Sequence, residues 1–262
     1  MIKHFTEVKP VPGKAIQITG GEPSLREDIY EIIDIIREEG IRHIQFNTDG
    51  IRLAFDPEFA KEIRRRGVNT VYLSFDGTTP ETNPKNHWEV PYAIENCRNA
   101  NRMGVVFVPT VIRTVNDHDL GNIIRIAAEN MDTVRGVNFQ PVSLTGRLTR
   151  KDRDKLRITA PDVIKLIEEQ TDGQITADDW YTVPCTTAIT RSVAASIKTT
   201  NQLAFTNHFA CGLGTYVFYE NGKFIPIPQF VDVDGFFEYL NEKAEELEKG
   251  KAEVQVIGFM FQ

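Results

Sequence analysis

The chain has 262 residues, of which 41% are hydrophobic, 30 are basic and 37 are acidic, so its net charge is −7. The length suits one large globular domain or a domain and a half, and the negative charge argues against nucleic-acid binding through a basic face. There is no apolar run of 18 residues, no secretory signal and no disulfide-like spacing of the three cysteines. We therefore expect a cytoplasmic protein without a transmembrane segment.

Between about residues 14 and 143, short β-branched runs alternate with amphipathic segments. Strands are expected at residues 15–19, 43–48, 70–77, 105–112 and 136–143. Helices are expected at residues 25–39, 57–66, 91–103 and 120–130, the first of them opened by a capping box of Ser24 and Glu27. A strand about every 30 residues predicts βα units in a parallel α/β sheet, either a barrel or an open doubly wound sheet.

The rhythm changes after about residue 143, where the chain becomes polar and irregular. We expect a helix at residues 161–170, a hairpin that turns at Asn221-Gly222, and a charged helix at residues 236–249. The predicted domains are therefore residues 1–147, the α/β part, and residues 148–262, an α+β extension.

Small polar residues follow most of the predicted strands, and the carboxyl ends of parallel strands share one edge. The residues expected at this mouth are Gly20, Gly21, Glu22, Asn47, Thr48, Asp49, Ser74, Asp76, Arg113, Asn116, Gln140 and Ser143. Asp-Gly pairs are also common turns, and Asn116-Asp117 can simply cap the next helix. Glu22 is different, because an acid held on two glycines suits a cationic group. The motifs of dinucleotide-binding, P-loop and serine-hydrolase sites are missing from the sequence.

The segments QITGGEPSLRED, NTDG, SFDG and VIRTVND, in this order, resemble the radical S-adenosylmethionine (SAM) superfamily. The resemblance implies a partial (β/α)6 TIM-like barrel, present from its second strand onward, with SAM across the strand ends. Glu22 would hold the amino group of SAM, Ser74 and Asp76 would lie near its ribose and carboxylate, and residues 105–108 would flank the adenine. The SAM-binding residues implied are Gly20, Gly21, Glu22, Pro23, Asn47, Thr48, Ser74, Asp76, Arg113, Asn116 and Gln140.

The second half of the chain narrows the resemblance to one group within this superfamily. GVNFQPVSLTGR, DWYTVPCT, HFACG and IPIPQFVDVDGFFEYL are similar to the group of archaeal tetraether lipid synthases and radical SAM pterin methyltransferases. The resemblance implies reductive cleavage of SAM to a 5′-deoxyadenosyl radical, for C–C bond formation on a lipid or methylation of a pterin. It also implies a 4Fe–4S cluster, an electron donor such as ferredoxin or flavodoxin, and a place in the cytoplasm or at the membrane surface.

One feature of that family is missing. Its cluster is held by a Cys-x3-Cys-x2-Cys motif, which Cys97, Cys185 and Cys211 cannot form. We therefore expect a fragment or a misplaced start, inactive by itself, that lacks the first strand and the cluster loop. The alternative is a degenerate, non-catalytic module that binds SAM or a partner. An aldolase-like barrel enzyme without iron is a weaker rival.

The three cysteines have different expected roles. Cys97 lies on the apolar face of a predicted helix, which indicates a core residue. Cys185 and Cys211 lie in irregular segments, and His208 precedes Cys211 by three residues. From the residues alone, both are either free thiols in a reducing compartment or metal ligands. The resemblance implies that Cys185, Cys211 and His208 bind an auxiliary iron–sulfur cluster, together with ligands from elsewhere.

Overall fold

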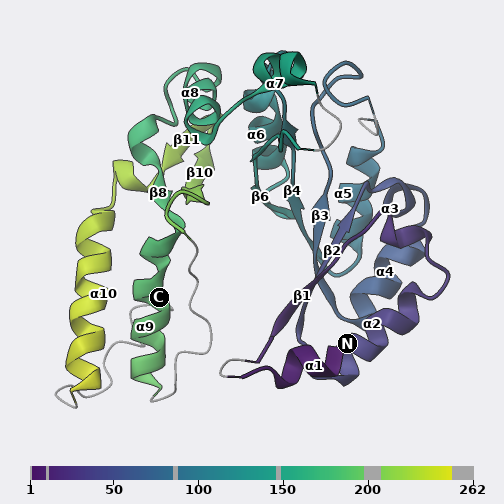
Figure 1. Ribbon diagram of the computed structural model, residues 1–262, viewed down its shortest axis with the longest axis horizontal. Helices are drawn as coiled ribbons and strands as arrows, with labels where there is room; N and C mark the ends of the chain where they lie inside the picture. The colour runs from purple at the N-terminus through teal and green to yellow at the C-terminus, as the bar shows by residue number, and fades with distance from the viewer. Residues whose placement is uncertain (1, 10–11, 85–87, 146–148, 198–207, 250–262) are drawn as a thin grey trace. The chain divides into compact units, whose positions relative to one another are not determined.

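The computed structural model describes residues 2–9, 12–84, 88–145, 149–197 and 208–249 (Figure 1). Contacts divide the chain into two compact units, residues 1–170 and residues 171–262. Each unit is described by itself below.

The first unit is built on a parallel sheet of five strands. These are β1 (Ala15–Ile18), β2 (His43–Thr48), β3 (Val68–Leu73), β4 (Gly104–Phe107) and β6 (Val134–Val137), in the order β1-β2-β3-β4-β6. Each strand pairs in parallel with the next, and Leu73 lies opposite Thr48 on one side and Phe107 on the other. The predicted parallel α/β sheet is thus confirmed.

The helices of this unit alternate with its strands, and α2, α4 and α5 run along one side of the sheet (Figure 1). Right-handed crossovers between sequential parallel strands place the connecting helices on the same face. The helices are α1 (Ile2–Glu7), α2 (Ile29–Glu38), α3 (Ile51–Phe55), α4 (Pro57–Arg66), α5 (Val90–Asn99), α6 (Leu120–Glu129), α7 (Arg150–Leu156) and α8 (Ala160–Gln170).

The predicted capping box at the first amphipathic helix is wrong. Residues Pro23–Leu25 form a separate 3-10 turn, η1, and Glu22 caps it by accepting a hydrogen bond from the Ser24 amide at 3.0 Å. The helix α2 starts only at Ile29, and the Asp28 side chain before it makes no capping bond. The Ser24 hydroxyl is buried and has no hydrogen-bond partner among the described residues. The acid, and not the serine, therefore organises this turn.

Two of the expected strands are each divided in two. Residues 105–112 form β4 and the short β5 (Thr110–Val111), and residues 136–143 form β6 and β7 (Gln140–Pro141). The strands β5 and β7 pair with each other, away from the five-stranded sheet. Pro109 lies at the first break, where a proline has no N–H to give to a ladder.

The core of the first unit lies between the sheet and its helices. It includes Ile33, Phe46, Phe59 and Phe107, all buried, and the rings of Phe46 and Phe59 are 6.1 Å apart. Cys97 is part of this core, as predicted, and burial raises the pKa of its thiol to about 12. Such a buried thiol stays protonated and unreactive at neutral pH.

The first compact unit extends to residue 170, and its last helix, α8, is attached to α6. The predicted domains, residues 1–147 and 148–262, stay a prediction. The Gln170 side chain accepts a hydrogen bond from the Gly121 amide at 2.9 Å and donates one to the Asp117 carbonyl at 2.7 Å. Arg125 donates to the Gln170 carbonyl at 2.7 Å. The helices α7 and α8 therefore belong with the sheet.

The second unit is α+β. Its elements are η2 (Ala177–Asp179), β8 (Tyr181–Thr182), η3 (Val183–Thr186), α9 (Thr187–Ser196), β9 (Leu213–Gly214), β10 (Val217–Glu220), β11 (Lys223–Pro226), η4 (Ile227–Gln229) and α10 (Val233–Glu248). The predicted hairpin is confirmed as β10 and β11, with Asn221 and Gly222 both at positive φ in its turn. The predicted charged helix is confirmed as α10.

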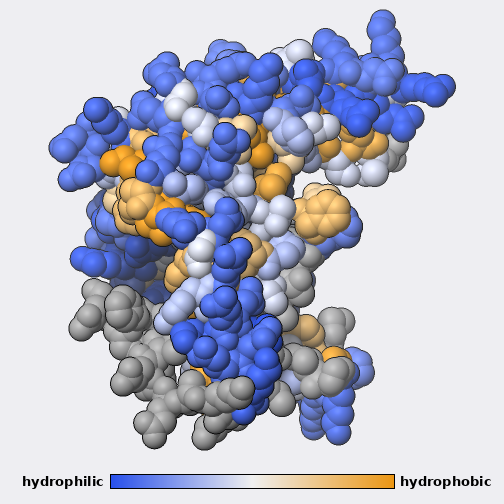
Figure 2. Space-filling model, turned by 90° about the vertical axis from the view of Figure 1, so that its left-hand side faces the viewer, coloured by the Kyte–Doolittle hydropathy of each residue, from blue (hydrophilic) through white to orange (hydrophobic). Residues whose placement is uncertain are grey.

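On the face drawn in Figure 2, hydrophobic side chains form small groups among hydrophilic ones. In the second unit, Phe218 and Phe230 are 54% and 57% exposed, and their rings lie 5.4 Å apart. None of the described helices has the length and apolar composition that a bilayer-spanning segment needs.

Candidate functional site

The carboxyl ends of β1, β2 and β3 bring the predicted mouth residues to one edge of the sheet. Two hydrogen bonds join these strand ends. The Asn47 side chain donates to the Thr19 hydroxyl at 3.1 Å, and the Ser74 amide donates to the Thr48 carbonyl at 3.0 Å. The segments after neighbouring strands thus form one continuous edge, as the parallel topology requires.

Glu22 ties β1 to β2 at this edge. Its Oε1 atom accepts hydrogen bonds from the Thr48 hydroxyl at 2.8 Å and the Ser24 amide at 3.0 Å. Its Oε2 atom accepts one from the Asp49 amide at 2.8 Å. A side-chain hydrogen bond with Asp49 adds to these three contacts. A half-buried acid held in this way is rigid and can accept from a cationic donor.

The backbone beside Glu22 is open. A Cβ atom added at Gly20 or at Gly21 would find no other atom within 4 Å, and both glycines are exposed. No described side chain covers this stretch, so a ligand can approach its N–H and C=O groups. Pro23 is buried in the first position of η1 and helps to fix the turn below.

Two further carboxylates make this edge acidic. Burial raises the pKa of Asp49, against a hydrogen bond from the Ile51 amide, and the charge of Glu22, a side-chain hydrogen bond to Glu22 and the charge of Glu89 raise it further. Glu89 is 6% exposed, and its Oε2 atom has no hydrogen-bond partner in the described part of the chain. Sequence reasoning missed Glu89, because it lies far from any strand end. Together these acids favour a positively charged ligand.

Asn116 and Asp76 connect the segment after β3 to β5. The buried Asn116 amide donates to the carbonyls of Asp76 and Thr110, at 2.7 and 2.8 Å. Its oxygen accepts from the Ile112 amide at 2.8 Å. The Asp76 carboxylate accepts from the Thr110 amide at 2.8 Å. Both amide hydrogens of Asn116 are therefore used inside the chain, which makes this residue part of the wall of the site.

Arg113 and Gln140 lie farther along the same edge, and both are exposed. Arg113 donates to the Arg157 carbonyl at 2.6 Å and pairs with Asp162 at 3.0 Å. Gln140 pairs through its backbone with Thr110. Their predicted roles in binding SAM stay predictions.

Asp119 is a buried acid that sequence reasoning missed. It precedes α6 and is 2% exposed, and it accepts hydrogen bonds from Thr78, Thr82 and Asn122. Burial raises its pKa, but these hydrogen bonds outweigh that effect and hold the pKa below its ordinary value. The pattern Asp-x-Asp-Leu before a helix is a weak signal, because it predicts only a cap.

The predicted metal ligands lie in the second unit. Cys185 follows β8 and Cys211 precedes β9, and the antiparallel pairing of these strands brings the two segments to the same end of the ladder. The His208 Nδ1 atom accepts from the Ala210 amide at 3.2 Å. Among the described residues, however, no three His, Cys, Asp or Glu side chains are gathered to hold a metal ion. The auxiliary-cluster assignment therefore stays a prediction.

The cysteines of this chain do not fit a radical SAM cluster. Cys97 is buried in the core, Cys185 is half-buried and Cys211 is exposed in the other unit. Burial and the charge of Asp234 raise the pKa of Cys185, which disfavours the thiolate that binds iron. The strand edge at Glu22 differs from these cysteines, because its open glycines and its fixed carboxylate suit a cationic amino group.

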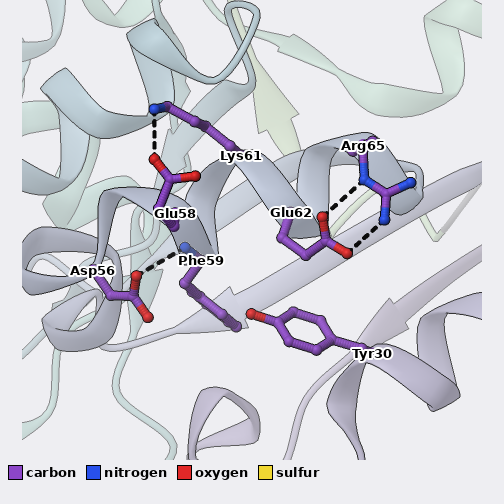
Figure 3. A pocket seen from close by; sticks show the side chains of 7 residues that line it. All are labelled: Tyr30, Asp56, Glu58, Phe59, Lys61, Glu62 and Arg65. Atoms are coloured by element: carbon purple, nitrogen blue, oxygen red, sulfur yellow. Dashed lines mark hydrogen bonds and ion pairs between the residues drawn. The ribbon is translucent and has the colours of Figure 1, made fainter.

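A surface cavity of about 400 Å³ lies away from the strand ends (Figure 3). Its lining residues come from α2, from α4 and from Asp56, which precedes α4. Their charges are paired with one another: Lys61 with Glu58, and Arg65 with Glu62 at 2.6 Å. Asp56 caps α4 by accepting from the Phe59 amide at 3.0 Å. These contacts are those of a solvated helix surface, so the candidate site is the strand edge.

Comparison with known proteins gives one family and several relatives. Residues 1–127 match the model of the radical SAM superfamily. Over 96% of its length the chain is 46% identical to a 7,8-dihydro-6-hydroxymethylpterin dimethyltransferase of Methanocaldococcus jannaschii, and it covers 50% of that protein. It is also 29% identical, over 52% of its length, to a GTP 3′,8-cyclase of Petrotoga mobilis, of which it covers 43%. The chain spans about half the length of these curated relatives.

Proposed function

We propose that this chain, which over residues 1–127 belongs to the radical SAM superfamily, is the SAM-binding part of an enzyme that methylates a pterin. The similarity to the pterin dimethyltransferase supports the substrate class. The observation that carries the proposal is Glu22, whose carboxylate is fixed by Ser24, Thr48 and Asp49 beside two open glycines.

The residues of this chain supply binding and orientation. The Glu22 carboxylate takes the amino group of SAM, and the backbone of Gly20 and Gly21 flanks it. Asp76, held by Asn116 and Thr110, forms another part of the proposed site. A charged, hydrogen-bonded contact of this kind is stronger than a neutral one and fixes direction.

A 4Fe–4S cluster belongs to the proposal for the whole protein. Since the three cysteines here do not fit it, we assign no step through the cluster to this chain, and its thiolates would come from outside these residues. The electron donor, a ferredoxin or flavodoxin, and a location in the cytoplasm or at a membrane surface belong to the same proposal. A lipid substrate is the alternative that the sequence resemblance leaves open, and neither relative compared above carries a lipid in its name.

The first experiment measures SAM binding to the purified chain by calorimetry, with Glu22→Gln as the variant and Glu27→Gln as its matched control. Glu27 is an exposed acid five residues away. Glu22→Gln should weaken SAM binding at least tenfold, which corresponds to about 1.4 kcal/mol, because it removes the charge that meets the ligand. Glu27→Gln should bind as the wild type does. Equal affinities in all three would overturn the assignment of Glu22.

The second experiment separates an enzyme from a non-catalytic module. A protein that contains this chain together with a Cys-x3-Cys-x2-Cys motif is reconstituted anaerobically with iron and sulfide and reduced with dithionite. It is then supplied with SAM and 7,8-dihydro-6-hydroxymethylpterin. Release of 5′-deoxyadenosine and a methylated pterin supports the proposal. SAM binding without cleavage favours the non-catalytic module, and methylation or coupling of a lipid alone would assign the other substrate.

A further inference from the structure

We infer that Asp119 is a positioning residue of the SAM site, which holds the segment after β3 in the shape that presents Ser74 and Asp76. The inference rests on the proposed function, because it concerns the same site. Asp119 itself does not touch the ligand in this proposal and acts through Thr78 and Thr82.

Most contacts of Asp119 lie outside its own helix, and the exception is the Asn122 side chain of α6, which donates to Oδ1 at 2.8 Å. The Thr78 amide donates to Oδ2 at 2.5 Å, and the Thr78 hydroxyl lies 2.8 Å from Oδ1. The Thr82 hydroxyl donates to Oδ2 at 2.8 Å. A carboxylate that precedes a helix normally accepts from the helix amides, yet Asp119 makes no such capping bond to α6. Apart from the bond from Asn122, its oxygens accept from Thr78 and Thr82, which lie 41 and 37 positions earlier in the chain.

The segment after β3 folds back tightly on itself. Thr79 and Thr82 exchange hydrogen bonds across one turn, and the Asn83 amide donates to the Thr79 carbonyl at 2.8 Å. A Cβ atom at Gly77 would collide with the Thr82 side chain. The turn is therefore closed between Gly77 and Thr82, and Asp119 binds both Thr82 and the residue next to Gly77.

Asp76 is thus held from two directions. The Asn116 amide donates to the Asp76 carbonyl, and Asp119 accepts from the amide of Thr78, two residues after Asp76. The two anchoring residues, Asn116 and Asp119, are buried and lie three positions apart before α6. Because these hydrogen bonds join residues of the chain itself, they order the loop without any contact from SAM. Ordering a site before binding raises affinity without adding a contact.

The test measures SAM affinity by calorimetry together with the melting temperature of the full chain. Asp119→Asn should raise Kd at least tenfold, since an amide nitrogen would face donors in the loop. Thr78→Val should weaken SAM binding severalfold, whereas Thr78→Ser, which keeps the hydroxyl, should restore wild-type affinity. The matched control is Asp132→Asn, an exposed acid that pairs with Arg98 at 2.6 Å beyond the other end of α6. It should lower the melting temperature and leave Kd unchanged.

Hydrogen exchange of the unliganded chain gives an independent readout. In Asp119→Asn, the amides of residues 74–83 should exchange at least tenfold faster than in the wild type, and those of α2 should not change. If the wild type binds SAM and Asp119→Asn binds it equally well, or if these amides keep their protection, the inference is wrong while the proposed function stands. If the wild type binds no SAM, the proposed function fails, and this inference fails with it.

Discussion

At the scale of single residues, acids near the sheet edge are held in opposite electrostatic states. Asp119 has a lowered pKa because its hydrogen bonds outweigh its burial. Asp49 has a raised pKa because burial dominates and Glu22 and Glu89 add to it. The first is a structural anchor that stays ionised, and the second ionises at an energetic penalty that a bound cation would relieve.

Asp49 gives a prediction with a definite sign. A carboxyl whose pKa is raised on folding binds its proton more tightly in the folded state, so the folded state loses relative stability as pH rises from the ordinary value, 3.8, through the raised one. Asp49→Asn removes this loss and keeps an oxygen for the Ile51 amide, which lies 3.0 Å from Oδ1.

The measurement is urea unfolding of both proteins at about pH 3 and about pH 6. The free energy of unfolding of Asp49→Asn, minus that of the wild type, should be more positive at the higher pH. A difference that is the same at both pH values, or that falls, would contradict the raised pKa.

At the scale of secondary-structure elements, one glycine decides where β2 ends and α3 begins. Gly50 precedes α3 and has φ 85°, and a Cβ atom there would collide with the Leu73 side chain on β3. Gly50→Ala should therefore destabilise the chain by about 1–3 kcal/mol.

Gly136→Ala is the matched control, because Gly136 lies in β6 with ordinary φ and with no atom within 4 Å of its Cβ position. Thermal unfolding of both variants is the measurement. A loss for Gly50→Ala that does not exceed that of Gly136→Ala would show that neither the backbone conformation nor the contact with Leu73 matters.

The sequence predicts most elements of the first unit, because buried strands and amphipathic helices have clear periods. It fails where tertiary contacts decide. The strands predicted through Pro109 and through Pro141 are each divided, since β5 and β7 find each other outside the main sheet. Ser24 and Glu27 have the sequence of a capping box, but Glu22 accepts from the Ser24 amide, which Glu27 would bind in such a box.

For the candidate site, the sequence predicts which strand ends meet, but not which residues face a ligand. The sequence predicts Asn116 at the pocket, and it does not predict that the Asn116 amide binds Asp76 and Thr110 within the chain. The role of Asp119 could not be predicted from the sequence, because its partners, Thr78 and Thr82, are distant in the sequence. Such polar contacts leave no periodic pattern, so only the folded chain reveals them.

At the scale of the whole molecule, the candidate SAM site and the predicted metal ligands lie in different compact units. If SAM binds at the strand ends, its stabilising effect should appear first in residues 1–170. At a ligand concentration of about 100 times Kd, a site that exists only in the folded state gains about 2.7 kcal/mol.

Hydrogen exchange with and without SAM tests this distribution. Protection should rise in residues 19–25, 47–50 and 74–83, and stay unchanged in β10, β11 and α10. Protection that appears mainly in α10 or in the hairpin would place the ligand in the second unit and would contradict the proposed site.

Glu22 has one further consequence. Its carboxylate connects the ends of β1 and β2 by hydrogen bonds from Thr48 and Asp49, and it is also the group proposed to bind the ligand. By thermodynamic reciprocity, a ligand that stabilises these hydrogen bonds must bind less tightly to any variant in which they are weakened. Substitutions that loosen the contact between the ends of β1 and β2 should therefore lower the affinity for the ligand, even where the substituted residue does not contact it.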